Sequence, residues 1–441
     1  MGRICLTLPT NRSCSPAISA IGQEAAYAAD TFGADVELLI LDSSDAATHA
    51  RHAAAVKALP RHPRITVHHL DEEDQRQFLR RVVHACANPE PDRMLDLLLP
   101  DSVSYGACTD RAFLYAAALG CDSVHRRDSD SRYQTHQGAP VFPVHHELRT
   151  LGRPAADAAR AVDRTDLDDR HMDRPVAMTG ASFVGELSVD IAEMKRLDPA
   201  TYTEVVGLWA PADWSAQQRR ELAEESFRGS GETTFTEDRS TLCLVDPMRV
   251  DMCNIAFHAV HERVPLPPAT DTIGSDYFLI HLVHDAELPG VLHNRDIVNF
   301  HTPHRGTDTG FLAYQRRFVK FLLSMLYFHH IYRRMARAGG DGLLDGNGQV
   351  RTDVVAALAR ESATLDRAEN IRRLDTVDAA YRRLGGRWQE CARRLKARRG
   401  QLLDEAQRDI EDFAALTEAW PSLVGAARAT PVSVPHLEPA R

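Results

Sequence analysis

The chain has 441 residues, of which 44% are hydrophobic and 26% are charged, and its formal net charge is −10. One hydrophobic core seldom serves a chain of this length, so we expect one large domain with a substantial addition. The negative charge argues against wholesale binding to nucleic acid or to an anionic membrane, although it leaves room for local basic sites.

The sequence also lacks the features of an exported or membrane-spanning protein. It contains no stretch of about 18 apolar residues that would form a membrane span. The apolar run before Pro9 is short and predicts a first strand instead of a secretory signal. The eight cysteines are scattered without a CxxC spacing, which is typical of reduced thiols. We therefore predict a cytoplasmic protein.

Strands and helices alternate in the first third of the chain. Short apolar runs predict strands at residues 4–10, 36–42 and 64–71, and helical periodicity follows each of them. This order predicts an α/β fold with a mostly parallel sheet and helices on both faces. In such sheets, ligands bind beyond the carboxyl ends of the strands. The polar residues expected at those ends are Thr10, Asn11, Arg12, Asp42 and Asp71.

The middle of the chain has weaker patterns. Helices are predicted at residues 110–119 and 209–227, and a strand-like stretch at residues 178–191. Residues 149–175 are rich in Ala, Arg and Asp without periodicity, which predicts a surface excursion or a mobile loop. Residues 230–247 predict a hairpin or loop.

The last part of the chain is helical, charged and almost free of strand patterns between residues 351 and 428. We expect it to form a helical addition that serves packing or homodimerisation. The glycine-rich residues 339–348 predict a turn, since their acidic spacing does not match a calcium-binding loop. We place the domains at residues 1–310 and 311–441.

The acidic triplet Asp128-Ser129-Asp130 follows a short predicted strand. Residues two apart at an extended strand end point the same way, so both carboxylates can converge on one cation. Hard oxygen ligands suit Mn²⁺ or Mg²⁺, which typically bridge a few carboxylates to substrate phosphates. Such an ion would neutralise charge on a departing diphosphate. The triplet therefore predicts the metal end of a phosphate-containing substrate site.

The order of the motifs LPTNR, VELLILD and DSD resembles that of GT-A glycosyltransferases, of the family-two-like, nucleotide-diphospho-sugar kind. The resemblance covers roughly residues 2–310. It implies a GT-A-like, Rossmann-like sheet and transfer of a sugar from a nucleotide-diphosphate donor to an acceptor, which we expect to be a small molecule. It makes Asp130 the main metal ligand. The residues it places at the nucleotide-sugar are Pro9, Thr10, Arg12, Asp42, Asp110, Arg111, Asp128 and Arg305.

A second cluster, 140 residues or more after the triplet, matches later family positions. By the resemblance, Asp276 stands where an acidic residue at a helix start orients or activates the acceptor, and a histidine in FHTPHR, His301 or His304, completes the metal shell. Arg305 is suited to pair with a diphosphate, because a guanidinium matches phosphate oxygens bidentately. The family's Trp- or Arg-rich acceptor motif is absent after Asp276, which leaves inversion and retention both open.

Three other functions fit parts of the pattern. A nucleotidyltransferase of sugar phosphates has the same fold but usually carries a glycine-rich loop after the first strand, and LPTNRSCSP contains no glycine. A non-catalytic nucleotide- or carbohydrate-binding protein would be favoured by loss of the acidic residues, which are present. A zinc hydrolase built on His145-His146-Glu147 lacks the helical i, i+4 spacing of such sites.

Overall fold

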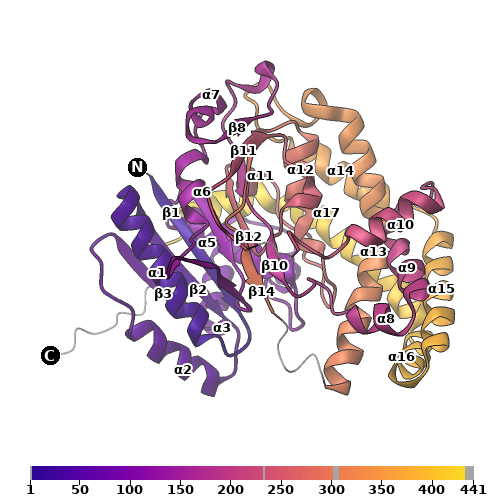
Figure 1. The fold of residues 1–441 in the computed structure, drawn as a ribbon. Coiled ribbons are helices and arrows are strands. Elements are labelled where there is room, and N and C mark those ends of the chain that lie inside the picture. The colour runs from indigo at the N-terminus through magenta and orange to yellow at the C-terminus, as the bar shows by residue number, and fades with distance from the viewer. Residues whose placement is uncertain (1, 232–233, 301–306, 433–441) are drawn as a thin grey trace.

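The computed structural model describes residues 2–231, 234–300 and 307–432 (Figure 1). The N-terminal elements, drawn in indigo, form one side of the molecule, and the orange and yellow C-terminal helices form the other. A large mixed sheet lies between helices, so the expected α/β architecture with a helical C-terminal part is confirmed. None of the described helices combines the length and apolar content needed to cross a membrane.

The main sheet has nine strands in the order β3-β2-β1-β4-β12-β9-β13-β11-β8. The first four are parallel, whereas β12 runs antiparallel to both of its neighbours and β11 runs antiparallel to β13. The strands are β1 Arg3–Thr10, β2 Asp35–Asp42, β3 Ile65–Leu70, β4 Ser123–Arg127, β8 Arg164–Thr165, β9 Met178–Gly180, β11 Ser240–Cys243, β12 Asn254–His258 and β13 Gly290–His293.

Two small sheets accompany it. One has the order β10-β14-β5 and the other pairs β6 with β7. Their strands are β5 Ser131–Tyr133, β6 Thr135–His136, β7 Ala139–Pro140, β10 Phe183–Gly185 and β14 Ile297–Asn299. Because β5 begins one residue after Asp130, the acidic triplet joins β4 of the main sheet to a strand of the smaller one.

Helices cover both faces of the main sheet. Successive side chains of a strand point to opposite faces, so Leu6 and Leu38 pack on the side of α1, and Cys5 and Leu39 pack on the opposite side, in the larger core. The helices of this half are α1 Ser15–Phe32, α2 Ala46–Lys57, α3 Glu72–Ala85, α4 Pro91–Leu98 and α5 Tyr105–Ala118. Asp71 and Asp74 begin α3 with a capping box.

The C-terminal helices pack on this half and on one another. Helix α17 lies against α14, α13 and α5, and its apolar residues belong to the same core cluster as α5. The packing role expected of this region is thus observed within one chain. The helices are α13 Asp308–Leu343, α14 Thr352–Ala363, α15 Ala368–Leu384, α16 Gly386–Ala397 and α17 Arg399–Ala429.

The structure refines two local predictions. Residues 149–175 lie mostly exposed at the edge of the main sheet, in keeping with a surface excursion, but they contain β8, which pairs with β11, and a small cluster in which Ala155 and Leu167 pack against Leu242. A few apolar residues are enough to hold this segment in place, because it packs only on the edge of the main sheet. The expected turn after Gly339 begins later, since α13 continues to Leu343 beyond a kink at Gly339, where φ is 57°.

Candidate functional site

A cavity of about 380 Å³ opens at the carboxyl ends of β1 and β4. Because these strands are parallel neighbours, the residues that follow them meet at one sheet edge. The turn after β1 contributes Arg12, and the triplet after β4 contributes Asp128 and Asp130. Residues from the C-terminal helical part, such as Phe321 of α13, line the cavity from another side.

Arg12 and Asp130 form an ion pair across the two strand ends. The Arg12 Nη1 atom donates to Asp130 Oδ2 at 2.6 Å. Burial alone would lower the pKa of Arg12, but the neighbouring carboxylates of Asp130 and Asp128 raise it above its ordinary value. Both groups face the cavity. A ligand that carries both an anionic group and a cation can therefore replace this ion pair, with its anion bound by Arg12 and its cation by Asp130.

The centre of the site is the buried guanidinium of Arg126 on β4. Its Nη2 atom lies 3.0 Å from Asp128 Oδ1, and its Nη1 atom lies 3.2 Å from Asp276 Oδ2. Nη1 also donates to the Met252 carbonyl at 2.7 Å. The Nε atom has no hydrogen-bond partner although it is buried. Arg126 thus fixes the positions of the Asp128 and Asp276 carboxylates in the cavity wall.

Asp276 belongs to the short 3-10 helix η5, Ser275–Tyr277, which precedes α12, Phe278–Asp285. The adjacent Tyr277 donates its hydroxyl to Asp251, whose other oxygen accepts the Cys253 amide at 2.9 Å. Gly274 enters this turn with φ of 70°, and a Cβ there would lie 2.9 Å from the Phe321 ring. A glycine at this position is required both by its backbone conformation and by the close aromatic ring.

The crowded carboxylates have shifted acidities. Burial raises the pKa of Asp128 to about 6, against the opposing effect of Arg126 and with a further contribution from Asp130 and Asp276. Burial likewise raises the pKa of Asp276, although Arg126 opposes the shift. Carboxyl groups with raised pKa values in a cavity are suited to exchanging protons or accepting a cation.

The Asp128→Asn variant is expected to be more stable than the parent protein at neutral pH. The folded-state pKa of Asp128 is about 6 against an ordinary value of 3.8, so its stabilising contribution is complete below 3.8 and is lost as the pH rises through 6. Asparagine stays neutral at every pH, so the variant does not lose stability by giving up a proton at this position. Melting temperatures measured without divalent cations should coincide at acidic pH and separate as the pH rises, whereas parallel curves would contradict the shift.

Most of the residues expected at the substrate line this cavity. They come from the end of β1 and the turn after it, from α5, from the triplet and from η5. These residues are Pro9, Thr10, Arg12, Arg111, Asp128, Asp130 and Asp276. Within the cavity wall, Arg111 is held by Gln75, at 2.8 Å, and by the Leu98 carbonyl, at 2.7 Å.

Two of the expected residues do not line the cavity. The Asp42 carboxylate is fully buried and accepts hydrogen bonds from the Ser44 amide, His52 and His69. Asp110 is also buried and accepts the Leu266 amide at 2.8 Å, which ties α5 to the segment after β12. Both side chains are instead enclosed by the protein and make hydrogen bonds within it. His301, His304 and Arg305 lie outside the described residues.

Sequence reasoning missed several cavity residues. Arg126 stands two residues before Asp128, so the alternation of a strand could have placed both at one face. Asp251 and Tyr277 had no such signal. An aromatic wall was also missed: Trp209 stacks on Phe227, with ring centroids 5.1 Å apart, and lies 5.7 Å from Phe321. All three rings line the cavity.

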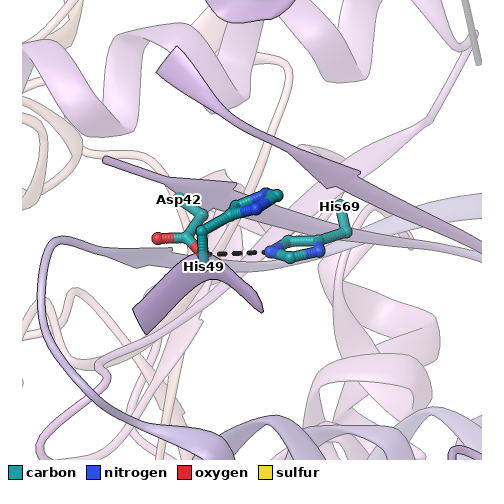
Figure 2. A group of neighbouring side chains, drawn as sticks. All are labelled: Asp42, His49 and His69. Atoms are coloured by element: carbon teal, nitrogen blue, oxygen red, sulfur yellow. Dashed lines mark hydrogen bonds and ion pairs between the residues drawn. The ribbon is translucent and has the colours of Figure 1, made fainter. Parts of the chain in front are cut away.

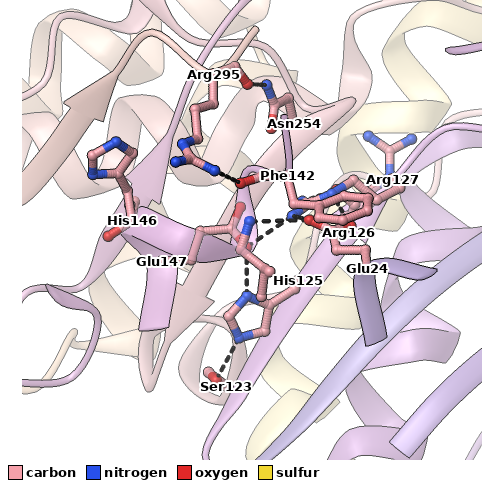
Figure 3. Close-up of polar contacts among 12 residues, drawn as sticks. Glu24, Ser123, His125, Arg126, Arg127, Phe142, His146, Glu147, Asn254 and Arg295 are labelled. Atoms are coloured by element: carbon pink, nitrogen blue, oxygen red, sulfur yellow. Dashed lines mark hydrogen bonds and ion pairs between the residues drawn. The ribbon is translucent and has the colours of Figure 1, made fainter. Parts of the chain in front are cut away.

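A second, fully buried charge network supports β4 from the opposite face (Figure 3). Arg127 donates from Nε and Nη2 to both oxygens of Glu24, at 3.0 and 2.8 Å, and from Nη2 to Glu147 at 2.9 Å. His125 Nδ1 contacts the same Glu147 oxygen at 2.7 Å. Since Arg126 and Arg127 are consecutive, one face of β4 serves the cavity and the other anchors α1 and α6, Val144–Thr150.

A protein-family model described as "Family of unknown function (DUF6271)" matches residues 2–436. No curated protein shows a significant match. Among solved structures, the chain is similar to mannosyltransferase PcManGT from Pyrobaculum calidifontis, in complex with GDP-Man and Mn²⁺, at 13% identity and a TM-score of 0.32. That alignment covers 97% of this chain and 86% of the other.

Proposed function

The chain belongs to the DUF6271 family, and from the geometry of its cavity we propose that it is a glycosyltransferase that uses a nucleotide-diphosphate sugar and a divalent cation. The observation that carries the proposal is the meeting of Arg12, Asp128, Asp130 and Asp276 at the carboxyl edge of β1 and β4. A basic group, two cation-binding carboxylates and a further acid are the groups that diphosphate transfer needs.

The Arg12–Asp130 pair supports binding of a diphosphate with its cation. When such a ligand enters, Asp130 can turn to the cation, and the released Arg12 guanidinium can donate to phosphate oxygens. Asp128, two residues earlier in the turn between β4 and β5, offers the second carboxylate. The cation would be Mn²⁺ or Mg²⁺, which typically binds one or two carboxylates and completes its shell with phosphate oxygens and water.

The chemistry of the cavity residues fits the metal ion. Asp128 and Asp130 supply only hard oxygen ligands, and burial raises the pKa of Asp128, with a further contribution from Asp130 and Asp276. A bound cation would offset the cost of keeping these buried carboxylates charged. When bound, the ion would stabilise the charge on the departing nucleoside diphosphate. Arg126 keeps Asp128 and Asp276 at fixed positions on two sides of its guanidinium.

Asp276 is the residue we assign as the base that accepts the proton of the acceptor hydroxyl. It lines the cavity, and burial raises its pKa toward the range in which a carboxylate takes up a proton effectively. The wall formed by Trp209, Phe227 and Phe321 offers flat apolar faces beside it. Such faces suit the C–H face of a sugar ring or a small apolar acceptor.

The proposal is tested by thermal shift with nucleoside diphosphates and nucleotide sugars, each with and without Mn²⁺. A ligand that binds only the folded state raises the melting temperature. At a free ligand concentration of about a hundred times Kd, it raises the free energy of unfolding by about 2.7 kcal/mol. We expect stabilisation only when nucleotide and Mn²⁺ are both present. The panel also identifies the preferred base. Stabilisation by no nucleotide in any combination would reject the proposal.

Asp130→Asn is expected to abolish the Mn²⁺-dependent part of this stabilisation, because the amide no longer supplies a negative ligand oxygen. Isothermal titration with the best nucleotide should show affinity in the variant that no longer depends on Mn²⁺. The matched control is Asp30→Asn, an exposed acid on α1 whose side chain is 71% exposed and contacts His62. Unchanged Mn²⁺ dependence in Asp130→Asn would remove this residue from the metal site.

A further inference from the structure

A group of metal-ligating side chains lies at the ends of β2 and β3 (Figure 2). Asp42 ends β2, His69 is the penultimate residue of β3, and His49 lies in the first turn of α2. One ligand atom from each lies within 4.8 Å of the other two. In the part of the chain that the structure describes, this is the one group of three such residues found.

The distances within the group suit a small divalent ion. His69 Nε2 lies 3.0 Å from Asp42 Oδ2. Tetrahedral ligands about 2.0–2.2 Å from a zinc ion are about 3.3–3.6 Å apart, so these two atoms need to separate by only a few tenths of an ångström for one ion to replace the proton between them. The His49 ring stacks on the His69 ring, with centroids 4.3 Å apart and planes 16° from parallel.

His49 provides the independent sign that a ligand belongs here. Its Nε2 atom is buried and has no hydrogen-bond partner, although the residue as a whole is half-buried. A buried imidazole nitrogen without a partner loses its hydration without compensation. A metal ion coordinated by this nitrogen would satisfy it, and the exposed part of the residue leaves the group open to entry from solvent.

The surroundings of Asp42 hold its carboxylate in a fixed orientation. The Cys14 amide donates to His52 Nε2 at 3.0 Å, so the His52 proton is on Nδ1, which donates to Asp42 Oδ2 at 2.7 Å. The Ser44 amide donates to Asp42 Oδ1 at 3.0 Å. Metal ligands are commonly oriented by such outer hydrogen bonds, and the orientation of Asp42 is therefore already set.

We propose that Asp42, His49 and His69 form a binding site for Zn²⁺ or a similar transition-metal ion. Two imidazoles and one carboxylate favour such ions over Mg²⁺ and Ca²⁺, which prefer oxygen ligands throughout. Three protein ligands leave a fourth position for water. The site is distinct from the acidic pair in the cavity and does not rest on the proposed sugar transfer.

Zinc binding is tested on the full chain, first stripped with a chelator, by competition with a chromogenic zinc indicator. We expect one tight site in the parent protein and more than about 100-fold weaker binding in His49→Ala and His69→Ala, since loss of even an outer hydrogen bond typically costs 10–100-fold. Co²⁺ should give the intense visible absorption of a four-coordinate site in the parent protein alone. Zinc should also raise the parent melting temperature.

Two controls make the result decisive. His84→Ala removes an exposed histidine of α3 and should leave zinc affinity unchanged. Asp130→Asn alters the cavity and should also leave it unchanged, so a failed sugar-transfer proposal would not affect this test. Circular dichroism checks the fold of His49→Ala, whose unbonded ring makes it the safest variant. Equal binding by the parent and both histidine variants, or loss of binding in Asp130→Asn alone, would overturn the site.

Discussion

Replacing Arg127 with methionine is expected to lower the free energy of unfolding by about 3–5 kcal/mol, the typical cost of removing one partner from a buried ion pair. The guanidinium is 2% exposed, and the carboxylates of Glu24 and Glu147 that it binds are 0% exposed. Without it, two buried carboxylates face each other with no cation between them. Urea unfolding followed by circular dichroism measures the loss.

The electrostatic cause of that loss has its own signature. In the parent protein, burial would raise the pKa of Glu147, but Arg127 and His125 hold it below its ordinary value. Removing Arg127 leaves only His125 to oppose the effect of burial, so the folded-state pKa of Glu147 rises. A group with a raised folded-state pKa loses its stabilising contribution as the pH rises. The deficit of Arg127→Met should therefore shrink as the pH is lowered.

Two control variants distinguish the effect of leaving buried charges unpaired from the effect of losing an arginine side chain. One replaces a surface arginine, and the other adds a compensating change to Arg127→Met. Arg160 pairs with Asp157 at 3.5 Å and is 83% exposed, so Arg160→Met should change stability by less than about 0.5 kcal/mol. Adding Glu147→Gln to Arg127→Met removes one stranded charge and should restore part of the stability. A double variant no more stable than Arg127→Met would show that packing, not charge, dominates.

Asp276→Asn is expected to reduce kcat for the proposed sugar transfer by about 10²–10⁴-fold, the usual contribution of a positioned general base. The amide keeps the shape of the side chain but cannot take the hydroxyl proton. Arg126 retains Asp128 and the Met252 carbonyl as partners, so the cavity should keep its form. The measurement is initial-rate kinetics with the nucleotide sugar that gives the largest thermal shift.

The binding of the donor distinguishes this role from a structural one. If Asp276 acts as the base, the Kd for the nucleoside diphosphate with Mn²⁺ should stay within a few-fold of the parent value while kcat falls. The pH profile of kcat should also lose its acidic limb. A parallel loss of nucleotide affinity and melting temperature would instead assign Asp276 to positioning of Arg126.

Much of the architecture follows from local sequence patterns. Alternating apolar runs and helical periodicity predicted β1 to β3 with α1 to α3, and the charged helical pattern after residue 351 predicted α14 to α17. Burial of one strand face or one helix stripe imposes such periods on the sequence itself. For the same reason, the polar residues at strand ends, including Arg12 and Asp130, could be expected at one edge of the sheet.

Only the tertiary structure decided which long-range partners meet. β12 was not predicted, yet it pairs antiparallel with β4 and brings the Asp251 segment beside a strand more than 120 residues earlier. Likewise, Asp42 was expected at the nucleotide-sugar, but its side chain contacts His52 and His69 and does not line the cavity. Periodicity records whether a residue is buried and not what it is buried against, because the partner is chosen by packing across the whole chain. The sequence by itself therefore determined the elements near the two ends of the chain and the edge of the sheet where the candidate site lies, while the fold determined how Arg126 joins Asp128 to Asp276 there.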